Sequence, residues 1–282
     1  MNFYQEFGVG KELEPFVECF WLLYVDEGIS GVSKILPDSS SELIFTRYAV
    51  SRKNNINSKL LFSGKSHLTT LKLNEQNIKL GPRVEFIGAR LKAHATSCFW
   101  NLRDTTEIDQ VIDARNLFPR QFINRIELLE SKLPYGIRLS ILHDLLTSQL
   151  KISNEFSFQK LTQAIQAIEA TRGNIKVNEL SSNLNCSSKT IGRYFIKYVG
   201  VTPKVYARLY RFRCFLIYHL NHREISMNQC AMKFGYYDEN HLYKEIETLL
   251  SKESQQLLKG YSQKKFNLQN YLLQNNKAAI AN

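Results

Sequence analysis

The residues best suited to chemistry lie on one face of a short C-terminal segment, Ser187 to Tyr198. At 3.6 residues per turn, its apolar residues share a face that must be buried: Ile191, Tyr194, Phe195 and Tyr198. The opposite face carries Ser188, Lys189, Gly192, Arg193 and, one turn further on, Lys197. Polar side chains on the open side of a helix can enter the major groove of DNA and contact bases or phosphates.

A second segment, Tyr237 to Ile246, repeats this arrangement. Three of its residues, Leu242, Lys244 and Ile246, stand 51 positions after Ile191, Arg193 and Phe195. Its own polar residues are Glu239, Asn240, His241 and Lys244. Two similar units in tandem are much harder to obtain by chance than one, although an ordinary helical domain with coincidental spacing is the alternative.

Each segment follows a short helix and a turn, the pattern of a helix-turn-helix unit. The first unit has a helix over 177–184, a turn at Asn185-Cys186 and Ser187 as N-cap. The second unit begins near Ile225 and turns at Gly235, which can adopt a left-handed conformation. Small residues, Ser181 and Ala231, allow the two helices of each unit to cross closely.

Two longer helices are expected around the first unit. The segment 158–171 is amphipathic and ends before Gly173, a plausible C-cap residue. Gly200-Val201-Thr202-Pro203 stops the first unit, and Pro203 begins a helix to about Leu220. That helix carries four cations, Lys204, Arg208, Arg211 and Arg213, and its charge suits a position near phosphates.

The charge distribution agrees with a polyanion-binding C-terminal half. Of the net +11, residues 151–282 hold 19 Lys+Arg against 9 Asp+Glu, whereas residues 1–150 hold 18 against 17. Phosphate neutralisation supplies much of the affinity for nucleic acid. A solvated basic surface gives the same count, so charge alone is weak support.

Other classes of function find little support in the residues. The five cysteines are scattered and read as reduced thiols, and His67, His94 and His143 lack a paired nucleophile or metal spacing. His219 and His222 offer two ligands without a third. We therefore expect no enzyme activity, metal or cofactor. With no membrane-length apolar run and no export leader, we expect a cytoplasmic protein.

The N-terminal half alternates short β-prone runs with polar turns, which predicts a small barrel or sandwich. The expected strands cover residues 19–25, 42–46, 59–64, 67–73 and 84–91. From Pro119 the period changes to helical, with one helix reaching Leu133 and another following Pro134-Tyr135-Gly136. Their apolar faces suggest packing or homodimerisation. Trp21 and Cys98-Phe99-Trp100 could line a sensor pocket, although such aromatic clusters are usually core.

Over residues 158–260 the sequence resembles the AraC/XylS family of transcription regulators. The resemblance is carried by the Ser187–Phe195 helix, the Gly200–Pro203 stop, the long linker helix and Ala231-x-x-x-Gly235-Tyr236-x-Asp238-x-Asn240-His241. The N-terminal half, through Trp21, residues 36–45 and residues 86–91, resembles a cupin-like sensor domain. This implies an α+β chain with residues 1–150 as regulatory domain, 151–157 as linker, 158–260 as a double helix-turn-helix domain and 261–282 as a polar tail.

The resemblance implies that two recognition helices read major-groove segments about one helical turn (~34 Å) apart. By position, base contacts fall to Ser188, Lys189, Gly192 and Arg193, and to Glu239, Asn240, His241 and Lys244, with Lys197 also at the DNA. Arg193 and Lys189 could contact guanine, Asn240 adenine and Glu239 cytosine. Phosphate contacts are the alternative for the cations, and His241 could cap or pack instead.

We therefore expect a DNA-binding regulator, more often an activator in such families, with double-stranded DNA, RNA polymerase and a small-molecule or protein effector as partners. The second unit departs from the family: Glu245 and Glu247 make it less basic, and Lys252-Glu253-Ser254 replaces a second Thr-Pro stop. This keeps open an alternative, a regulatory protein whose degenerate helical half binds another regulator or RNA polymerase.

Overall fold

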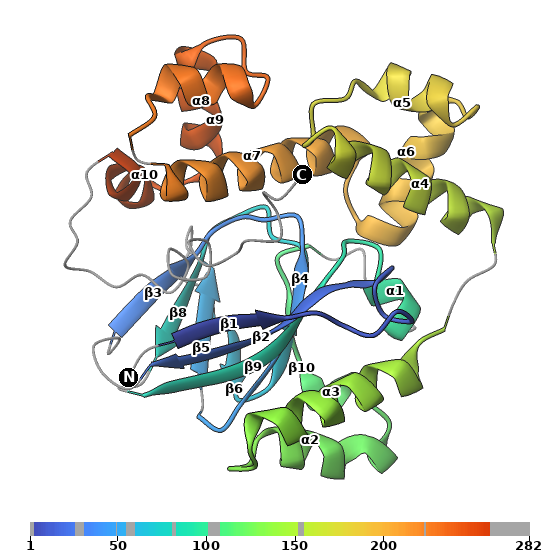
Figure 1. Ribbon diagram of the computed structural model, residues 1–282, viewed down its shortest axis with the longest axis vertical. Helices are drawn as coiled ribbons and strands as arrows, with labels where there is room; N and C mark the ends of the chain where they lie inside the picture. The colour runs from blue at the N-terminus through green and yellow to red at the C-terminus, as the bar shows by residue number, and fades with distance from the viewer. Residues whose placement is uncertain are drawn as a thin grey trace.

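The computed structural model describes residues 3–25, 31–48, 50–54, 60–80, 83–100, 108–151, 155–222 and 224–259. It has an N-terminal sheet domain and a C-terminal helical domain, the two-part α+β architecture expected from the sequence (Figure 1). Residues 152–154 of the expected linker and the expected tail, 261–282, lie outside the described residues. No helix in the described part of the chain has the length and hydropathy that crossing a membrane requires.

Two antiparallel sheets form the first domain. The larger one contains, in spatial order, β1 (Phe3–Phe7), β2 (Val17–Val25), β9 (Val84–Leu91), β4 (Ser41–Thr46), β7 (His67–Thr69) and β10 (Val111–Asp113). The smaller one contains β3 (Gly31–Ile35), β8 (Gln76–Leu80), β5 (Val50–Asn54) and β6 (Leu60–Gly64). The described strands make two separate sheets, which agrees with the sandwich alternative, and they do not close into a barrel.

Strand alternation divides the apolar residues of the larger sheet between two cores. Trp21, Ile44 and Phe86 face the smaller sheet, whereas Leu22 and Leu43 face the helices on the other side. Those helices are α1 (Thr96–Phe99), α2 (Ile123–Leu129) and α3 (Tyr135–Gln149), with 3-10 turns at Ala114–Asn116 and Arg120–Phe122. Trp21 and Cys98-Phe99-Trp100 are all buried core residues, the alternative to a sensor pocket raised from the sequence.

Two expectations for this domain are corrected. The strand expected over 67–73 ends at Thr69, because Lys72 instead forms an isolated bridge with Asp38 and an ion pair of 2.9 Å to its carboxylate. The helix expected to reach Leu133 ends at Leu129. At this end of the domain the Arg138 side chain on α3 is buried against Glu85 and the Leu129 carbonyl oxygen, which ties α3 and α2 to the sheet.

The helical domain contains α4 (Phe156–Ala170), α5 (Val177–Asn183), α6 (Ser188–Val199), α7 (Pro203–Asn221), α8 (Met227–Lys233), α9 (Glu239–Leu249) and α10 (Lys252–Lys259). We call α5–α6 the first head and α8–α9 the second head. In Figure 1, α7 runs between the sheet domain and the two heads, with the first head at one end and the second at the other. The two helix-turn-helix units and the linker helix are thus present in the fold.

Local sequence signals explain the boundaries of these helices. Ser187, Thr202, Ser226 and Asp238 each accept a hydrogen bond from a backbone N–H in the first turn of α6, α7, α8 and α9. The glycines that end α4, α6 and α8 have positive φ angles of 77°, 86° and 69°: Gly173, Gly200 and Gly235. Helix α10 was not expected from the sequence.

Buried apolar residues join the two domains into one body. The core of the helical domain also includes Leu36, Leu71 and Ala93 of the sheet domain. Phe158, in the first turn of α4, packs edge-on against the His94 ring with centroids 5.6 Å apart. Burial, with the charge of Lys92 adding to it, lowers the pKa of His94 to about 4. The histidine at this junction is therefore neutral in the folded protein.

Substitution of Gly173 tests the contact between the loop that follows α4 and helix α7. A Cβ there would lie 2.2 Å from the Ala207 carbonyl oxygen, in addition to the strain of the positive φ. We expect Gly173→Ala to lower the free energy of unfolding by more than about 1 kcal/mol in urea titration. The matched control is Gly192→Ala inside α6, where a Cβ meets nothing within 4 Å. It should leave stability unchanged or raise it by up to ~1 kcal/mol, and equal effects of the two substitutions would contradict this account.

The neutral His94 also predicts a pH dependence of stability. Below pH 6.5, the ordinary pKa of histidine, His94 is protonated in the unfolded state but stays neutral in the folded state. The free energy of unfolding therefore decreases as the pH is lowered from about 6.5 to about 4. Between pH 7 and pH 5, the free energy of unfolding should decrease by about 2 kcal/mol less in His94→Leu than in the wild type, measured by urea titration. His241→Gln, at an exposed position, serves as control; a His94→Leu profile parallel to the wild type would refute this assignment.

Candidate nucleic-acid interface

The outward face of α6 holds the residues expected to read bases in the first head. Lys189 and Arg193 are exposed, and Gly192 between them leaves that stretch of the helix without a side chain. The opposite face is anchored by Ile191 and Phe195, both buried in the core of the helical domain. Burial of the apolar stripe therefore fixes the orientation of the two cations toward solvent.

Ser188 and Lys197 are more constrained than the sequence indicated. The Ser188 hydroxyl lies 2.8 Å from the Ser181 hydroxyl and donates to Asn178 Oδ1, so it holds α5 and α6 together. Lys197 Nζ donates to Glu155 Oε2 at 2.9 Å, and Tyr198 donates to the same oxygen at 2.7 Å. These donors and Ser157 lower the pKa of Glu155 to about 2. Lys197 is thus paired at the start of α4.

In the second head, Asn240, His241 and Lys244 are exposed on α9, and Glu239 is half-buried. The His241 ring packs edge-on against Tyr236 at 5.4 Å, and its Nδ1 accepts a hydrogen bond from the Tyr237 N–H at 3.3 Å. His241 therefore supports the turn before α9, the capping alternative raised from the sequence. Leu242 and Ile246 are buried as the 51-residue repeat requires.

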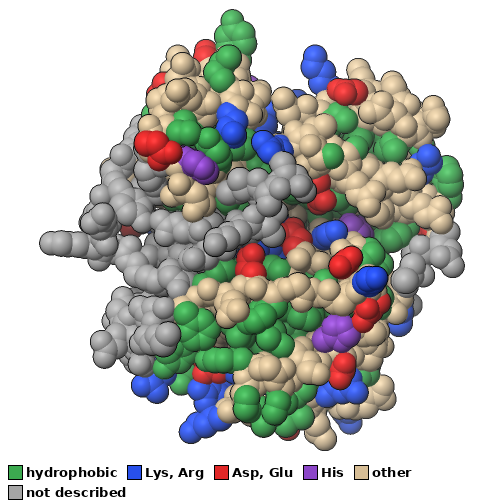
Figure 2. All heavy atoms as spheres, in the orientation of Figure 1, with side chains coloured by type: hydrophobic (Ala, Val, Ile, Leu, Met, Phe, Trp, Pro, Cys, Tyr) green, Lys and Arg blue, Asp and Glu red, His purple; other side chains and the backbone are tan. Residues whose placement is uncertain are grey.

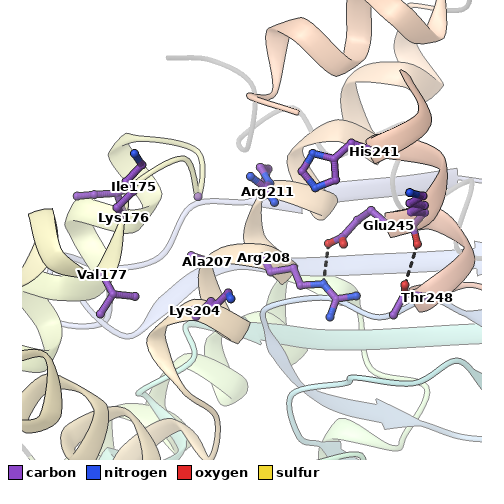
Figure 3. A pocket seen from close by; sticks show the side chains of 12 residues that line it. Ile175, Lys176, Val177, Lys204, Ala207, Arg208, Arg211, His241, Glu245 and Thr248 are labelled. Carbon is purple, nitrogen blue, oxygen red and sulfur yellow. Dashed lines mark hydrogen bonds and ion pairs between the residues drawn. The ribbon is translucent and has the colours of Figure 1, made fainter. Parts of the chain in front are cut away.

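A hollow of about 610 Å³ separates the two heads above α7 (Figure 3). It is lined on one side by the loop from α4 to α5, on the other by α9, and along its floor by α7. Its charged residues and histidine are Lys176, Lys204, Arg208, Arg211, His241, Lys244 and Glu245. Figure 2 shows a few Lys and Arg side chains near the space between the two heads. We call this hollow the inter-head groove; it carries one carboxylate among five Lys and Arg residues.

Two of the groove cations are held by neighbouring side chains. Arg208 Nε donates to Glu245 Oε1 at 2.8 Å, as the dashed line in Figure 3 marks, so Glu245 fixes the guanidinium rather than facing a ligand. The Arg211 guanidinium lies over the Tyr236 ring, 4.5 Å from its centroid. Glu245 was expected to make α9 less basic, because the helical period alone does not show that its partner, Arg208, lies on α7.

The fourth cation of α7, Arg213, does not line the groove. It is two and a half turns from Lys204, on the opposite side of the helix, and it is buried in an ion pair with Glu18. Grouping Arg213 with the other α7 cations near phosphates was therefore wrong. The helical period places Lys204, Arg208 and Arg211 together and separates Arg213 from them.

The structure also places the cysteines and His67, which were weighed as ligands or nucleophiles in the sequence. Within these ranges no group of three or more His, Cys, Asp or Glu side chains could hold a metal ion. The cysteines are free thiols, and burial raises the pKa of Cys19, Cys98, Cys214 and Cys230. Arg52 Nε donates to His67 Nε2 at 2.8 Å; burial and that guanidinium hold the pKa of His67 well below its usual range. A neutral, buried His67 is part of the core.

Comparison with known proteins gives a family match in the sheet domain and matches among solved structures. The model of a domain of unknown function, DUF6597, matches residues 5–113, most of the sheet domain. No curated protein matches the chain. Among solved structures, ToxT from Vibrio cholerae O395 is similar at 8% identity and a TM-score of 0.48, covering 86% of this chain and 99% of its own. ToxT bound to an unsaturated fatty acid (strain SCE256) reaches a TM-score of 0.43 at 9% identity, covering 85% and 95%.

The AraC-like transcriptional activator CuxR is similar at 10% identity and a TM-score of 0.21, covering 96% of this chain and 100% of its own. Such low identities and TM-scores carry no conclusion about activity. The class that the fold itself defines is a two-domain protein with tandem helix-turn-helix heads on a shared helix.

Proposed function

We propose that this protein is a sequence-specific DNA-binding transcription regulator of the AraC/XylS type, and not an enzyme. One observation carries the proposal: two helix-turn-helix heads, each with an exposed polar face, flank a groove lined by five cations and one carboxylate. The heads would enter successive major-groove segments, and the groove would receive the phosphate backbone that joins them.

The two heads have unequal parts in this reading. Lys189 and Arg193 are exposed and can reach guanine O6 and N7, whereas the Ser188 hydroxyl is engaged within the head and Lys197 is paired with Glu155. In the second head, Asn240 and Lys244 are the exposed candidates, and His241 supports the turn. Lys189, Arg193, Asn240 and Lys244 thus become the leading candidates for base contact.

The remaining parts of the proposal concern control. The sheet domain would act as the sensor, receiving a small molecule or a protein, and the DNA-bound protein would contact RNA polymerase as an activator. Helices α2 and α3 expose Leu128 and Ile137, apolar residues that could join two copies. A sheet domain that sediments as a monomer would count against dimerisation through these helices.

Selection of random duplex DNA by the purified chain tests sequence-specific binding. We expect enrichment of a motif with two sub-sites about one turn (~34 Å) apart, because the heads share one helix. Arg193→Ala should lose selectivity at one sub-site and Lys244→Ala at the other, with each lost contact weakening binding by about 1–3 kcal/mol. A single sub-site, or loss of both from either substitution, would contradict bipartite reading.

The groove predicts a separate, sequence-independent effect. Lys204→Gln and Arg208→Gln should each weaken binding to every duplex to a similar extent and reduce the slope of log affinity against log salt by about one. Lys132→Gln removes the same charge from an exposed position on the sheet domain and should change neither quantity. The measurement is a fluorescence-anisotropy titration at several salt concentrations. If the slopes of the two groove variants equal that of the Lys132→Gln control, the groove does not contact phosphates.

The alternative of a regulatory interaction protein has one structural feature in its favour. Met232 and Tyr237, on either side of the Gly235 turn, are 65% and 87% exposed and give the second head an apolar edge. Large exposed apolar residues are common at protein interfaces. No motif enrichment, together with salt-insensitive or absent DNA binding, would favour this function over DNA reading.

A further inference from the structure

Glu18 leaves the pattern of its strand at a β-bulge. Val17 pairs with Leu91 and Cys19 with Arg90, so Glu18 is the extra residue between them. A bulge re-aims the side chain of the inserted residue and often does so at functional positions. The Glu18 carboxylate thereby reaches α7, which lies far away in sequence.

The carboxylate meets Arg213 in a two-point ion pair. Arg213 Nη1 donates to Glu18 Oε1 at 2.9 Å, and Nη2 donates to Oε2 at 2.6 Å. The Arg213 side chain is 5% exposed and that of Glu18 is 21% exposed. Burial alone would raise the pKa of Glu18, yet Arg213 holds it below its ordinary value. A paired, fork-like contact of this kind fixes direction as well as distance.

The sheet domain also holds the end of the second head. Lys34 Nζ donates to Ser251 Oγ at 3.0 Å and lies 3.0 Å from a Glu253 carboxylate oxygen. The Ser251 backbone N–H donates to Glu75 Oε1 at 3.1 Å. These contacts fall at the junction of α9 and α10, where the sequence lacks the expected second Thr-Pro stop.

The Glu18–Arg213 ion pair contacts α7 from the side opposite the inter-head groove. Arg213 is about 180° around the helix from Lys204 and about 160° from Arg211. The sheet domain therefore holds α7 without covering the groove, as Figure 1 shows for the placement of α7 between domain and heads. Control by simple blockage of the DNA surface does not fit this geometry.

We propose that Glu18 and Arg213 are positioning residues through which the sheet domain sets the separation and orientation of the two heads. Lys34, with Glu75, provides a second point of attachment at the second head. The consequence for DNA reading rests on the function proposed above. A change in the sheet domain at the Glu18 bulge would be transmitted to both heads through α7.

Spin-label distances between the heads test the positioning role without DNA. Labels at Glu179→Cys on α5 and Asn228→Cys on α8, both exposed, would be placed in a Cys186→Ser background. We expect a narrow distance distribution in the otherwise unaltered chain and one at least twice as broad in Glu18→Gln. Adding Lys34→Met to Glu18→Gln should broaden it further.

Two further variants separate positioning from stability. Glu18→Gln/Arg213→Met leaves no buried charge unpaired, so its thermal stability should recover toward wild type while the distribution stays broad. Glu85→Gln removes a buried carboxylate that pairs with Arg138, away from α7, and should keep the distribution narrow. A narrow distribution in the double variant, or an equally broad one in Glu85→Gln, would overturn the proposal.

Binding to the selected duplex connects this device to function. Insertion of two base pairs between sub-sites rotates one by about 70° around the duplex. The insertion should weaken DNA binding by the wild type at least tenfold. It should weaken binding by Glu18→Gln/Arg213→Met less than threefold, because the heads of that variant can follow the rotated sub-site. Equal spacing dependence in both would also overturn the proposal. If the wild type enriches no DNA, the proposed function fails, and the label distances still decide the positioning role.

Discussion

Helix α7 must satisfy partners on several sides, and this requirement organises the whole molecule. Its apolar residues, including Phe212, Phe215 and Leu216, form the core shared by both heads. One of its polar faces forms the floor of the inter-head groove, and Arg213 on the opposite face pairs with the sheet domain. A helix of 19 residues spans about 28 Å, so it can support two heads at a separation comparable to one turn of DNA.

Local signals explain how much of the helical domain could be predicted. The N-cap at Ser187 and the left-handed glycines at Gly173 and Gly235 act within a few residues, so they can be identified from sequence. Ile191 and Leu242 occupy equivalent buried positions in the two heads, as do Phe195 and Ile246, and the 51-residue repeat predicts this. The partner of Arg213 could not be predicted, because a β-bulge 195 residues away supplies it and neither residue type nor spacing marks that bulge.

The sheet domain was harder to derive for related reasons. Strand β9 was expected with its observed bounds, since it is long and continuously buried. Strands β1, β3, β5, β8 and β10 were not expected from the sequence: they are short, and several carry buried polar residues such as Arg52 and Gln76 that obscure the apolar period. A buried polar side chain between two sheets needs a hydrogen-bond partner from another strand, and for Arg52 that partner is His67. The pattern of residues along one strand does not show which strand supplies the partner.

In the function proposed above, both heads of one chain contact the same face of a DNA duplex. Hydroxyl-radical footprinting of the complex on a selected duplex tests it most directly, because it reports protection of the backbone at each nucleotide. The structure predicts two protected patches on one face, centred about 10 base pairs apart, with protection of the phosphates between them where α7 lies. Protection confined to a single patch, or patches on opposite faces of the duplex, would contradict it.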